Sequence, residues 1–235
     1  MTFPLSVQPK VVTKQLDAFG WQADEFGCGT LRIRMPFEAL RDKGYHVGNG
    51  GVLMRDEKDL PKTLLGQRLC KDAPAKMWFT IAVRKQRPKM VYELDDDLWN
   101  VDQSSPTAYE WFMKGYDRET NTYHDVKGNL RRGMKVADAI TCTTEPLAEI
   151  LRQFNDNVHI IPNYLPKWIL DWERPRTKRL SIGWMGSGTH NMDWDFCGQH
   201  IKRFLDRNPQ IEFRVIGTDR PENIGFKDNG QVVCD

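Results

Sequence analysis

The chain has 235 residues, of which 40% are hydrophobic and 28% charged, a balance typical of a globular protein with one or two domains. Lysine and arginine number 34 against 32 acidic residues, so the net charge of +2 gives no electrostatic reason to expect nucleic acid or an anionic membrane as a partner. The five cysteines are scattered without a CxxC pair, which argues against a disulfide framework or a zinc site and indicates a reducing compartment.

Strand and helix patterns alternate along the first 170 residues, as expected of an α/β domain with a mainly parallel sheet. The upstream elements are a weak strand at 10–14, a glycine turn at 27–30 that opens a helix, a strand that starts after Gly44, and a helix or strand at 76–83. The downstream elements are a strand at 89–94, a long helix from Tyr123 to about Ala137, a strand at 139–142, a helix at 147–154 and a strand at 158–161. Residues 50–75 have no pattern that predicts an element.

A second α/β unit follows a change of composition between residues 165 and 179, where prolines, tryptophans and charges indicate an interdomain connection. Its elements are a strand at 180–185, a glycine loop at 186–188, a helix at 195–208 and a strand at 211–216. We therefore predict two domains, residues 1–170 and 171–235. One strand-helix-strand unit leaves both sheet edges uncovered, so the second domain is expected to be truncated or completed elsewhere.

Five segments, in this order, resemble the group 1 (family 4-like) glycosyltransferases of the GT-B fold, especially versions seen in bacteriophages and actinobacteria. The segments are Gly27–Gly29 with Arg32 and Pro36, VYELDDDLW at 91–99, ADAITCTTEPLAEIL at 137–151, HIIPNYL at 159–165 and SIGWMGSGTH at 181–190. The resemblance implies two Rossmann-like domains, the first holding mainly the acceptor and the second the nucleotide-sugar donor.

The reaction implied by the resemblance is transfer of a sugar from the nucleotide-sugar donor to an acceptor hydroxyl on a protein, glycan or lipid. Retention at the anomeric carbon, no metal and no other cofactor belong to the same expectation. No signal peptide and no apolar run of about 18 residues occurs, so we expect a cytoplasmic protein, of a bacterial host if the chain is phage-encoded, without a transmembrane segment.

The candidate catalytic residues are Asp95, Asp96 and Asp97, at the end of a predicted parallel strand where α/β sheets build their sites. Adjacent carboxylates repel one another, so a cation, an arginine or substrate hydroxyls should compensate them. One of them is expected to orient or deprotonate the acceptor hydroxyl; the alternative is an acid that caps the following segment. Many group 1 enzymes have a histidine near this point, and its absence leaves the catalytic role of the aspartates open.

Two glycine loops are the candidate phosphate sites. Gly27 and Gly29 allow close approach of a ligand, and by resemblance this loop faces the donor phosphates and the acceptor, with Arg32 adding charge; a plain tight turn is the alternative. The resemblance assigns the donor diphosphate to the second loop, made of Gly186, Ser187, Gly188, Thr189 and His190. A further strand end supplies Thr143, Thr144 and Glu145, which either face the cleft or cap the next helix.

Three alternatives remain open. A GT-A-type glycosyltransferase would use Asp95–Asp97 as a D-x-D signature for a divalent metal. A nicotinamide-dependent dehydrogenase is a poor fit, because Asn191 occupies the last glycine position of the dinucleotide fingerprint. A non-catalytic nucleotide-sugar-binding fragment is the third, because the sequence ends at Asp235, before the E-x7-E segment of the family, which leaves open whether these residues alone are catalytically competent.

Overall fold

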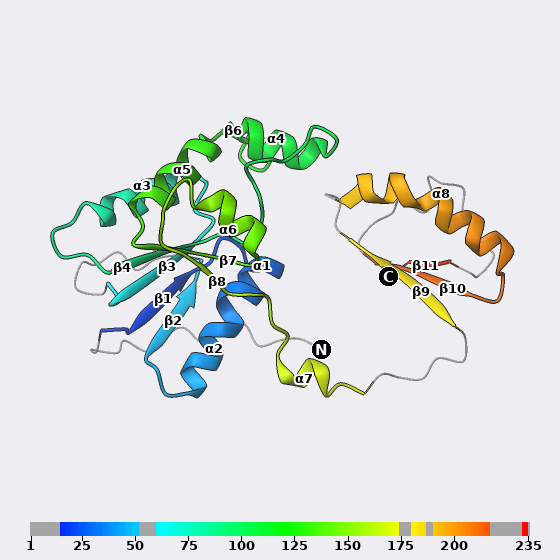
Figure 1. Cartoon of the computed structure of the whole chain (residues 1–235), viewed down its shortest axis with the longest axis horizontal. Helices are drawn as coiled ribbons and strands as arrows, with labels where there is room; N and C mark the ends of the chain where they lie inside the picture. The colour runs from blue at the N-terminus through cyan, green and yellow to red at the C-terminus, as the bar shows by residue number, and fades with distance from the viewer. Residues whose placement is uncertain (1–14, 52–59, 174–179, 187–189, 217–231, 235) are drawn as a thin grey trace. The chain divides into compact units, whose positions relative to one another are not determined.

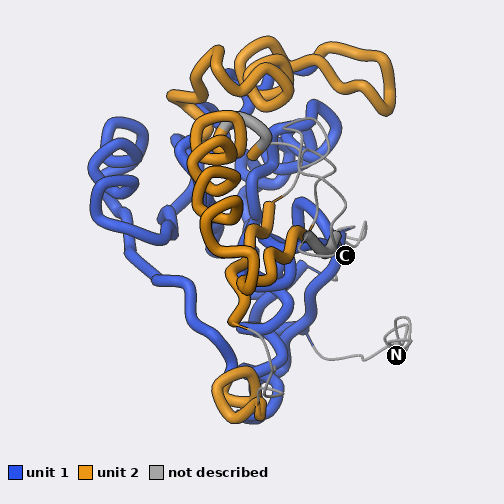
Figure 2. Tube along the Cα trace, turned by 90° about the vertical axis from the view of Figure 1, so that its right-hand side faces the viewer, with its two compact units in different colours: residues 1–97, 124–166 blue, residues 98–123, 167–235 orange. Residues whose placement is uncertain are grey.

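The computed structural model describes residues 15–51, 60–173, 180–186, 190–216 and 232–234. The chain forms two compact units, coloured separately in Figure 2: Met1–Asp97 with His124–Pro166, and Leu98–Tyr123 with Lys167–Asp235. The predicted domain boundary at residue 170 stays a prediction.

A six-stranded parallel sheet forms the centre of the first unit (Figure 1). Its strands are β1 (Ala18–Trp21), β2 (Val47–Gly50), β3 (Thr63–Gln67), β4 (Lys89–Glu93), β7 (Ala139–Cys142) and β8 (Val158–Ile160). The spatial order is β2-β1-β3-β4-β7-β8, and every pairing is parallel. Because β2 and β3 pair with opposite edges of β1, the direction of strand addition reverses between β1 and β3.

Helices cover both faces of this sheet. They are α1 (Gly27–Gly29), the π-helical turn η1 (Thr30–Arg34), α2 (Met35–Asp42), α3 (Asp72–Ala82), α5 (Val126–Val136) and α6 (Glu145–Leu151). On one face, Ile33 of η1 and Phe37 of α2 pack with Ala18 and Leu65 of the sheet. On the other, Trp78 of α3 contacts the ring of Tyr92 edge-on. This three-layer arrangement confirms the predicted α/β class with a Rossmann-like sheet.

The element boundaries differ from the sequence prediction at several points. Strands β1 and β3 lie where no strand was predicted, and the strand predicted at 10–14 lies outside the described residues. The predicted long helix begins at Val126 rather than Tyr123, because Asp125 caps it by accepting a hydrogen bond from the Gly128 amide. The segment 76–83, left open as helix or strand, belongs to α3.

In the second unit, residues 98–123 form α4 (Pro106–Lys114) and a two-stranded antiparallel pair, β5 (Tyr116–Asp117) and β6 (Thr122–Tyr123). Helix α4 ends at Gly115, whose φ of 75° is in the left-handed region. A one-turn helix, α7 (Lys167–Leu170), opens the remainder of the unit.

A parallel strand-helix-strand unit follows, as predicted. Strands β9 (Ser181–Met185), β10 (Glu212–Ile216) and β11 (Val232–Cys234) form a parallel sheet, and α8 (Asn191–Arg207) connects β9 to β10. Its small core is centred on Trp194, which stacks on Phe213 at 5.8 Å between ring centroids. No helix among the described residues is both long enough and apolar enough to cross a membrane.

Candidate functional site

The carboxyl ends of β1, β3, β4 and β7 lie at the same edge of the first sheet, and polar side chains gather there. Open parallel sheets bind ligands at this edge, at the point where the direction of strand addition reverses. In this chain that point lies between β1 and β3. The segment after β1 and the residue after β3 are joined across it by an ion pair between Asp24 Oδ2 and Arg68 Nη2, 2.6 Å long.

A row of buried polar side chains crosses the sheet just inside this edge. Gln67 of β3 pairs in register with Glu93 of β4, and Glu93 with Thr141 of β7. Their exposed fractions are only 0–6%, so each polar atom needs a partner inside the protein. Glu93 meets this need with two donors: Arg32 Nε donates to Oε1 at 2.7 Å, and the Thr141 hydroxyl donates to Oε2. Burial raises the pKa of Glu93, while the Arg32 guanidinium opposes that shift.

Arg32 is buried, and its guanidinium hydrogen-bonds to three different residues. Besides Glu93, its Nη1 donates to the carbonyl oxygen of Ile161 at 2.6 Å and to Asn163 Oδ1 at 3.1 Å. The guanidinium thus ties η1 to β4 and to the segment after β8. These contacts account structurally for the residue, and its predicted contact with a donor phosphate stays a prediction.

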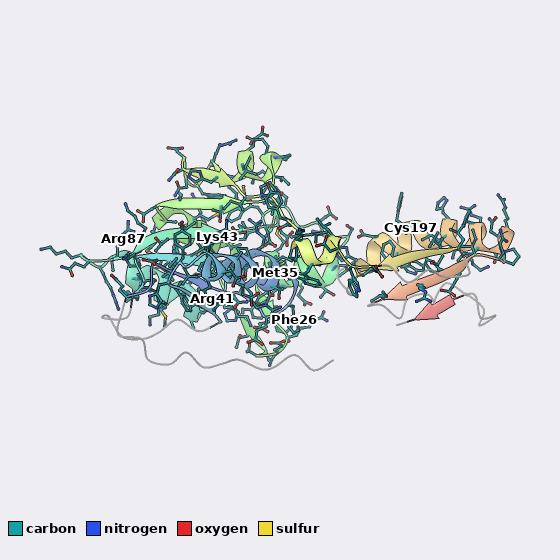
Figure 3. The ribbon with its side chains drawn as sticks, turned by 90° about the horizontal axis from the view of Figure 1, so that it is seen from below. Phe26, Met35, Arg41, Lys43, Arg87 and Cys197 are labelled. Atoms are coloured by element: carbon teal, nitrogen blue, oxygen red, sulfur yellow. The ribbon has the colours of Figure 1, made fainter. Side chains whose placement is uncertain are left out.

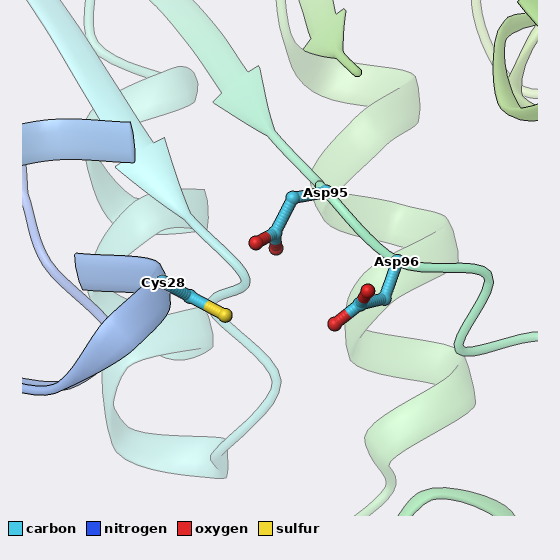
Figure 4. Close-up of side chains that lie close together, drawn as sticks. All are labelled: Cys28, Asp95 and Asp96. Carbon is cyan, nitrogen blue, oxygen red and sulfur yellow. The ribbon is translucent and has the colours of Figure 1, made fainter. Parts of the chain in front are cut away.

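The aspartates predicted from the sequence stand at the sheet edge, next to a cysteine that sequence reasoning did not select. Cys28 of α1 lies opposite Asp95 and Asp96 (Figure 4). One ligand atom from each of the three side chains lies within 4.8 Å of the other two. Burial and the neighbouring Asp95 raise the pKa of Cys28 to about 12. Asp97, the third predicted aspartate, is half-buried and is not part of this group.

Asp95 is held in place by the backbone around it. The Thr143 hydroxyl donates to the carbonyl oxygen of Asp95 at 3.1 Å, and the Leu94 amide donates to the carbonyl oxygen of Thr141 at 3.0 Å. Within the described part of the chain, Asp95 Oδ1 is buried and has no hydrogen-bond partner. Such an atom is costly unless something satisfies it, which marks this carboxylate as a candidate ligand-binding group.

The glycines of the first loop have different roles. A Cβ on Gly29 would lie 1.8 Å from the carbonyl oxygen of Asp24, so glycine is required there by the chain's own turn. Asp24 Oδ1 closes that turn by accepting from the amides of Phe26 and Gly29. A Cβ on Gly27 would meet no atom within 4 Å. The turn therefore explains Gly29 without a ligand, and phosphate contact by the loop stays a prediction.

The predicted group Thr143, Thr144 and Glu145 separates into three roles. Thr143 anchors Asp95, as described. Thr144 occupies the N-cap position of α6, but its side chain makes no capping hydrogen bond, so the capping alternative is not seen for it. Glu145 forms an exposed ion pair with Arg152 at 2.7 Å.

In the second unit, Ser187, Gly188 and Thr189 of the predicted donor loop lie outside the described residues, whereas Gly186 and His190 lie within them. The Gly186 amide donates to the carbonyl oxygen of Ile216 at 3.1 Å. His190 precedes α8, and its Nδ1 lies 2.8 Å from Asp193 Oδ2 in the first turn of that helix. The loop thus leads from the carboxyl end of β9 to the N-terminus of a 17-residue helix.

Sequence reasoning missed Cys28, Gln67, Arg68, Glu93 and Thr141 as site residues. Glu93 offered a usable signal: an acid at the last position of a strong strand, directly before a run of aspartates, belongs to the functional edge of a parallel sheet. Cys28 stood inside the glycine motif that was selected. Arg68 had no local signal, because β3 itself was not predicted.

No protein-family model matches this chain, and no curated protein matches it. Among solved structures, 37 chains match. One is a crystal structure of TarM, which aligns over 76% of this chain and 34% of its own, at 11% sequence identity and a TM-score of 0.48. This chain therefore spans about a third of that structure, and a likeness at this score and identity supports no statement about function.

Proposed function

We propose that this chain belongs to a nucleotide-sugar-dependent glycosyltransferase of the GT-B kind, with the acceptor held by the first unit and the donor by the second. The observation that carries the proposal is the pair of carboxylates, Asp95 and Asp96, at the carboxyl edge of the six-stranded parallel sheet. The ordered motifs that resemble group 1 glycosyltransferases support the same proposal. Retention and independence of metal are part of it.

The acceptor chemistry proposed for the first unit needs a fixed carboxylate. A carboxylate within hydrogen-bond reach of a hydroxyl orients it and accepts its proton as the new bond forms. Asp95 suits this role, because Thr143 fixes its backbone and its buried Oδ1 has no hydrogen-bond partner among the described residues. Glu93, two residues before Asp95, forms a buried ion pair with Arg32 that stabilises the strand end from which Asp95 projects.

The donor chemistry proposed for the second unit depends on a helix N-terminus. The leaving nucleoside diphosphate gains negative charge as the sugar departs, and free amides at a helix N-terminus stabilise that charge. Helix α8 begins directly after the loop that follows β9, which is the place where this family of folds puts a diphosphate. Among the described residues of this loop, His190 is the polar side chain that could contact the diphosphate, and its bond to Asp193 orients the ring.

The test is sugar transfer or donor hydrolysis by the full chain, measured with a panel of nucleotide sugars. We expect turnover that falls by about 100-fold or more in Asp95→Asn, the usual loss when a general base is removed. Asp156→Asn is the matched control, because Asp156 is exposed and lies before β8, at the amino edge of the same sheet. Turnover that is unchanged in Asp95→Asn would overturn the catalytic assignment.

Two other outcomes point to the alternatives. Saturable binding of a nucleotide sugar without any turnover identifies a binding module and contradicts the enzymatic proposal. Turnover that is lost completely on chelation and restored by manganese identifies metal-dependent chemistry and contradicts the metal-independent proposal.

A further inference from the structure

Cys28, Asp95 and Asp96 converge from two segments that are distant in the sequence. Cys28 lies in α1, after β1, and the two aspartates follow β4, which is two strands away in the sheet. One ligand atom from each residue, the thiol sulfur and one oxygen of each carboxylate, lies within 4.8 Å of the other two. Figure 4 shows the three side chains pointing into the same space between the two segments.

Besides a hydrogen bond between the Cys28 and Asp95 side chains, contacts of neighbouring residues hold this convergence. On one side, Gln22 Nε2 donates to the carbonyl oxygen of Gly29 at 3.2 Å, and Asp24 bonds to Arg68 of β3's carboxyl end. On the other, Thr143 bonds to the backbone of Asp95. Two of these contacts tie the cysteine's segment to the sheet and one ties the aspartates' segment to β7. The three side chains are therefore brought together before any ligand arrives.

The arrangement has an excess of electron-pair donors. The Cys28 thiol hydrogen-bonds to the Asp95 carboxylate, but Asp95 Oδ1 is buried without a hydrogen-bond partner in the described residues, and Asp96 adds a second carboxylate at short range. The guanidinium of Arg68, which interacts electrostatically with Cys28 and Asp95, already forms an ion pair with Asp24. A buried carboxylate oxygen without a donor is destabilising, and a bound cation removes that cost.

We propose that Cys28, Asp95 and Asp96 are three protein ligands of a site for a borderline divalent cation such as Zn²⁺, with water completing the coordination. The ligand set decides the class of metal. Magnesium and calcium take oxygen ligands, whereas a sulfur together with carboxylates suits zinc and metals of similar softness. Three protein ligands and an open fourth position are typical of zinc sites that exchange a bound water.

This site goes beyond the proposed function, which uses no metal. Both need the Asp95 carboxylate, so a bound cation competes with an acceptor hydroxyl for it. Occupancy of the site by zinc is therefore expected to slow sugar transfer, and this consequence rests on the proposed function. The binding itself does not, because metal occupancy can be measured whether or not the chain transfers sugar.

The test uses Co²⁺ as a spectroscopic probe on the full, untagged, reduced and metal-free chain. A thiolate bound to Co²⁺ gives a charge-transfer absorption in the near ultraviolet, and added Zn²⁺ should displace the cobalt and abolish it. We expect one such site per chain in the wild type. Loss of an outer-shell partner already lowers metal affinity about 10- to 100-fold, so Asp96→Asn, which removes a ligand, is expected to weaken binding at least as much.

Two cysteine variants separate the proposed site from adventitious binding. Cys28→Ser should lose the absorption, whereas Cys197→Ser should keep it, because Cys197 lies on α8 in the other unit (Figure 3). Circular dichroism checks that each variant is folded, and Asp96, being exposed, can be replaced with little risk to folding. No absorption in the wild type, or equal absorption in Cys28→Ser, would overturn the proposal.

Discussion

The buried ion pair between Arg32 and Glu93 offers a sharp test of how the site edge is stabilised. The Nε···Oε1 distance is 2.7 Å, and only 5% and 3% of the two side chains are exposed. Breaking a buried pair by removing one partner costs about 3–5 kcal/mol, because an uncompensated charge stays in the interior. We therefore expect Arg32→Met to lower the free energy of unfolding of the first unit by about that amount.

Two comparisons separate the contribution of this ion pair from an unspecific loss of stability caused by the substitution. The double variant Arg32→Met/Glu93→Gln leaves no buried charge, so it should be more stable than Arg32→Met alone. Lys62→Met is the matched control, because Lys62 and Asp17 form an ion pair of similar length that is 60% and 37% exposed. An exposed pair contributes about 0–1 kcal/mol.

The pH dependence of the Arg32→Met variant provides a second observable. Burial raises the pKa of Glu93 in the folded state. A group with a raised folded-state pKa contributes most to stability when it is protonated, and loses that contribution as pH rises through the folded-state pKa. Without Arg32 the shift becomes larger, so the variant should lose less stability at about pH 5 than at about pH 8.

The assay is urea unfolding, with hydrogen exchange of residues 89–93 to follow the first unit separately from the second. An Arg32→Met variant that loses no more stability than Lys62→Met would refute the reasoning. So would a double variant no more stable than Arg32→Met itself.

Three further predictions concern the same unit. Arg87 holds the pKa of Asp138 at about 2, so this ion pair stabilises the fold above the ordinary carboxyl pKa, and the stabilisation is lost as pH falls toward 2. Because the two side chains are 29% and 30% exposed, Asp138→Asn should lower the free energy of unfolding at neutral pH by about 1 kcal/mol. The variant should also lose less stability than the wild type on acidification, and an unchanged acid dependence would contradict this. The pKa of Cys28 is about 12 against an ordinary 9.0, which lowers the thiolate fraction of this side chain roughly 1000-fold at neutral pH. Its alkylation rate, followed by mass spectrometry, should therefore still rise at about pH 10. A plateau of the rate at about pH 9 would refute the shift. Gly29→Ala should destabilise the unit by about 1–3 kcal/mol or more in urea unfolding while Gly27→Ala is tolerated, and equal effects would contradict the turn geometry.

The elements that could be predicted from sequence are those whose own residues specify them. The strand at 89–94 is mostly apolar, runs directly into aspartates and is confirmed as β4. The strands predicted at 139–142 and 180–185 are confirmed as β7 and β9. Strand β1 is only four residues long and contains Gly20, and β3 ends in Gly66 and Gln67. Both strands lie inside the sheet because β2 pairs with β1 and β4 pairs with β3. These tertiary contacts, rather than a local sequence pattern, determine that β1 and β3 are strands.

The candidate site could be predicted only in part for the same reason. Asp95 and Asp96 were found because they follow a strong strand. Cys28 lies close to them because β1 and β4 flank β3 in the sheet, and no local sequence pattern predicts that strand order. The ion pair between Arg32 and Glu93 joins positions 61 residues apart, so the sequence around one residue does not predict the other as its partner.

The proposed function assigns the acceptor to the carboxyl edge of the six-stranded sheet and the nucleotide sugar to the N-terminus of α8. Hydrogen exchange of the full chain, with and without a saturating nucleotide sugar, tests it most directly. We expect slower exchange at the first amides of α8 and, when an acceptor is added, after β4 near Asp95. Amides 155–157, before β8 at the amino edge, should be unchanged. Protection that is confined to the amino edge, or absent at saturation for every nucleotide sugar tested, would contradict the claim.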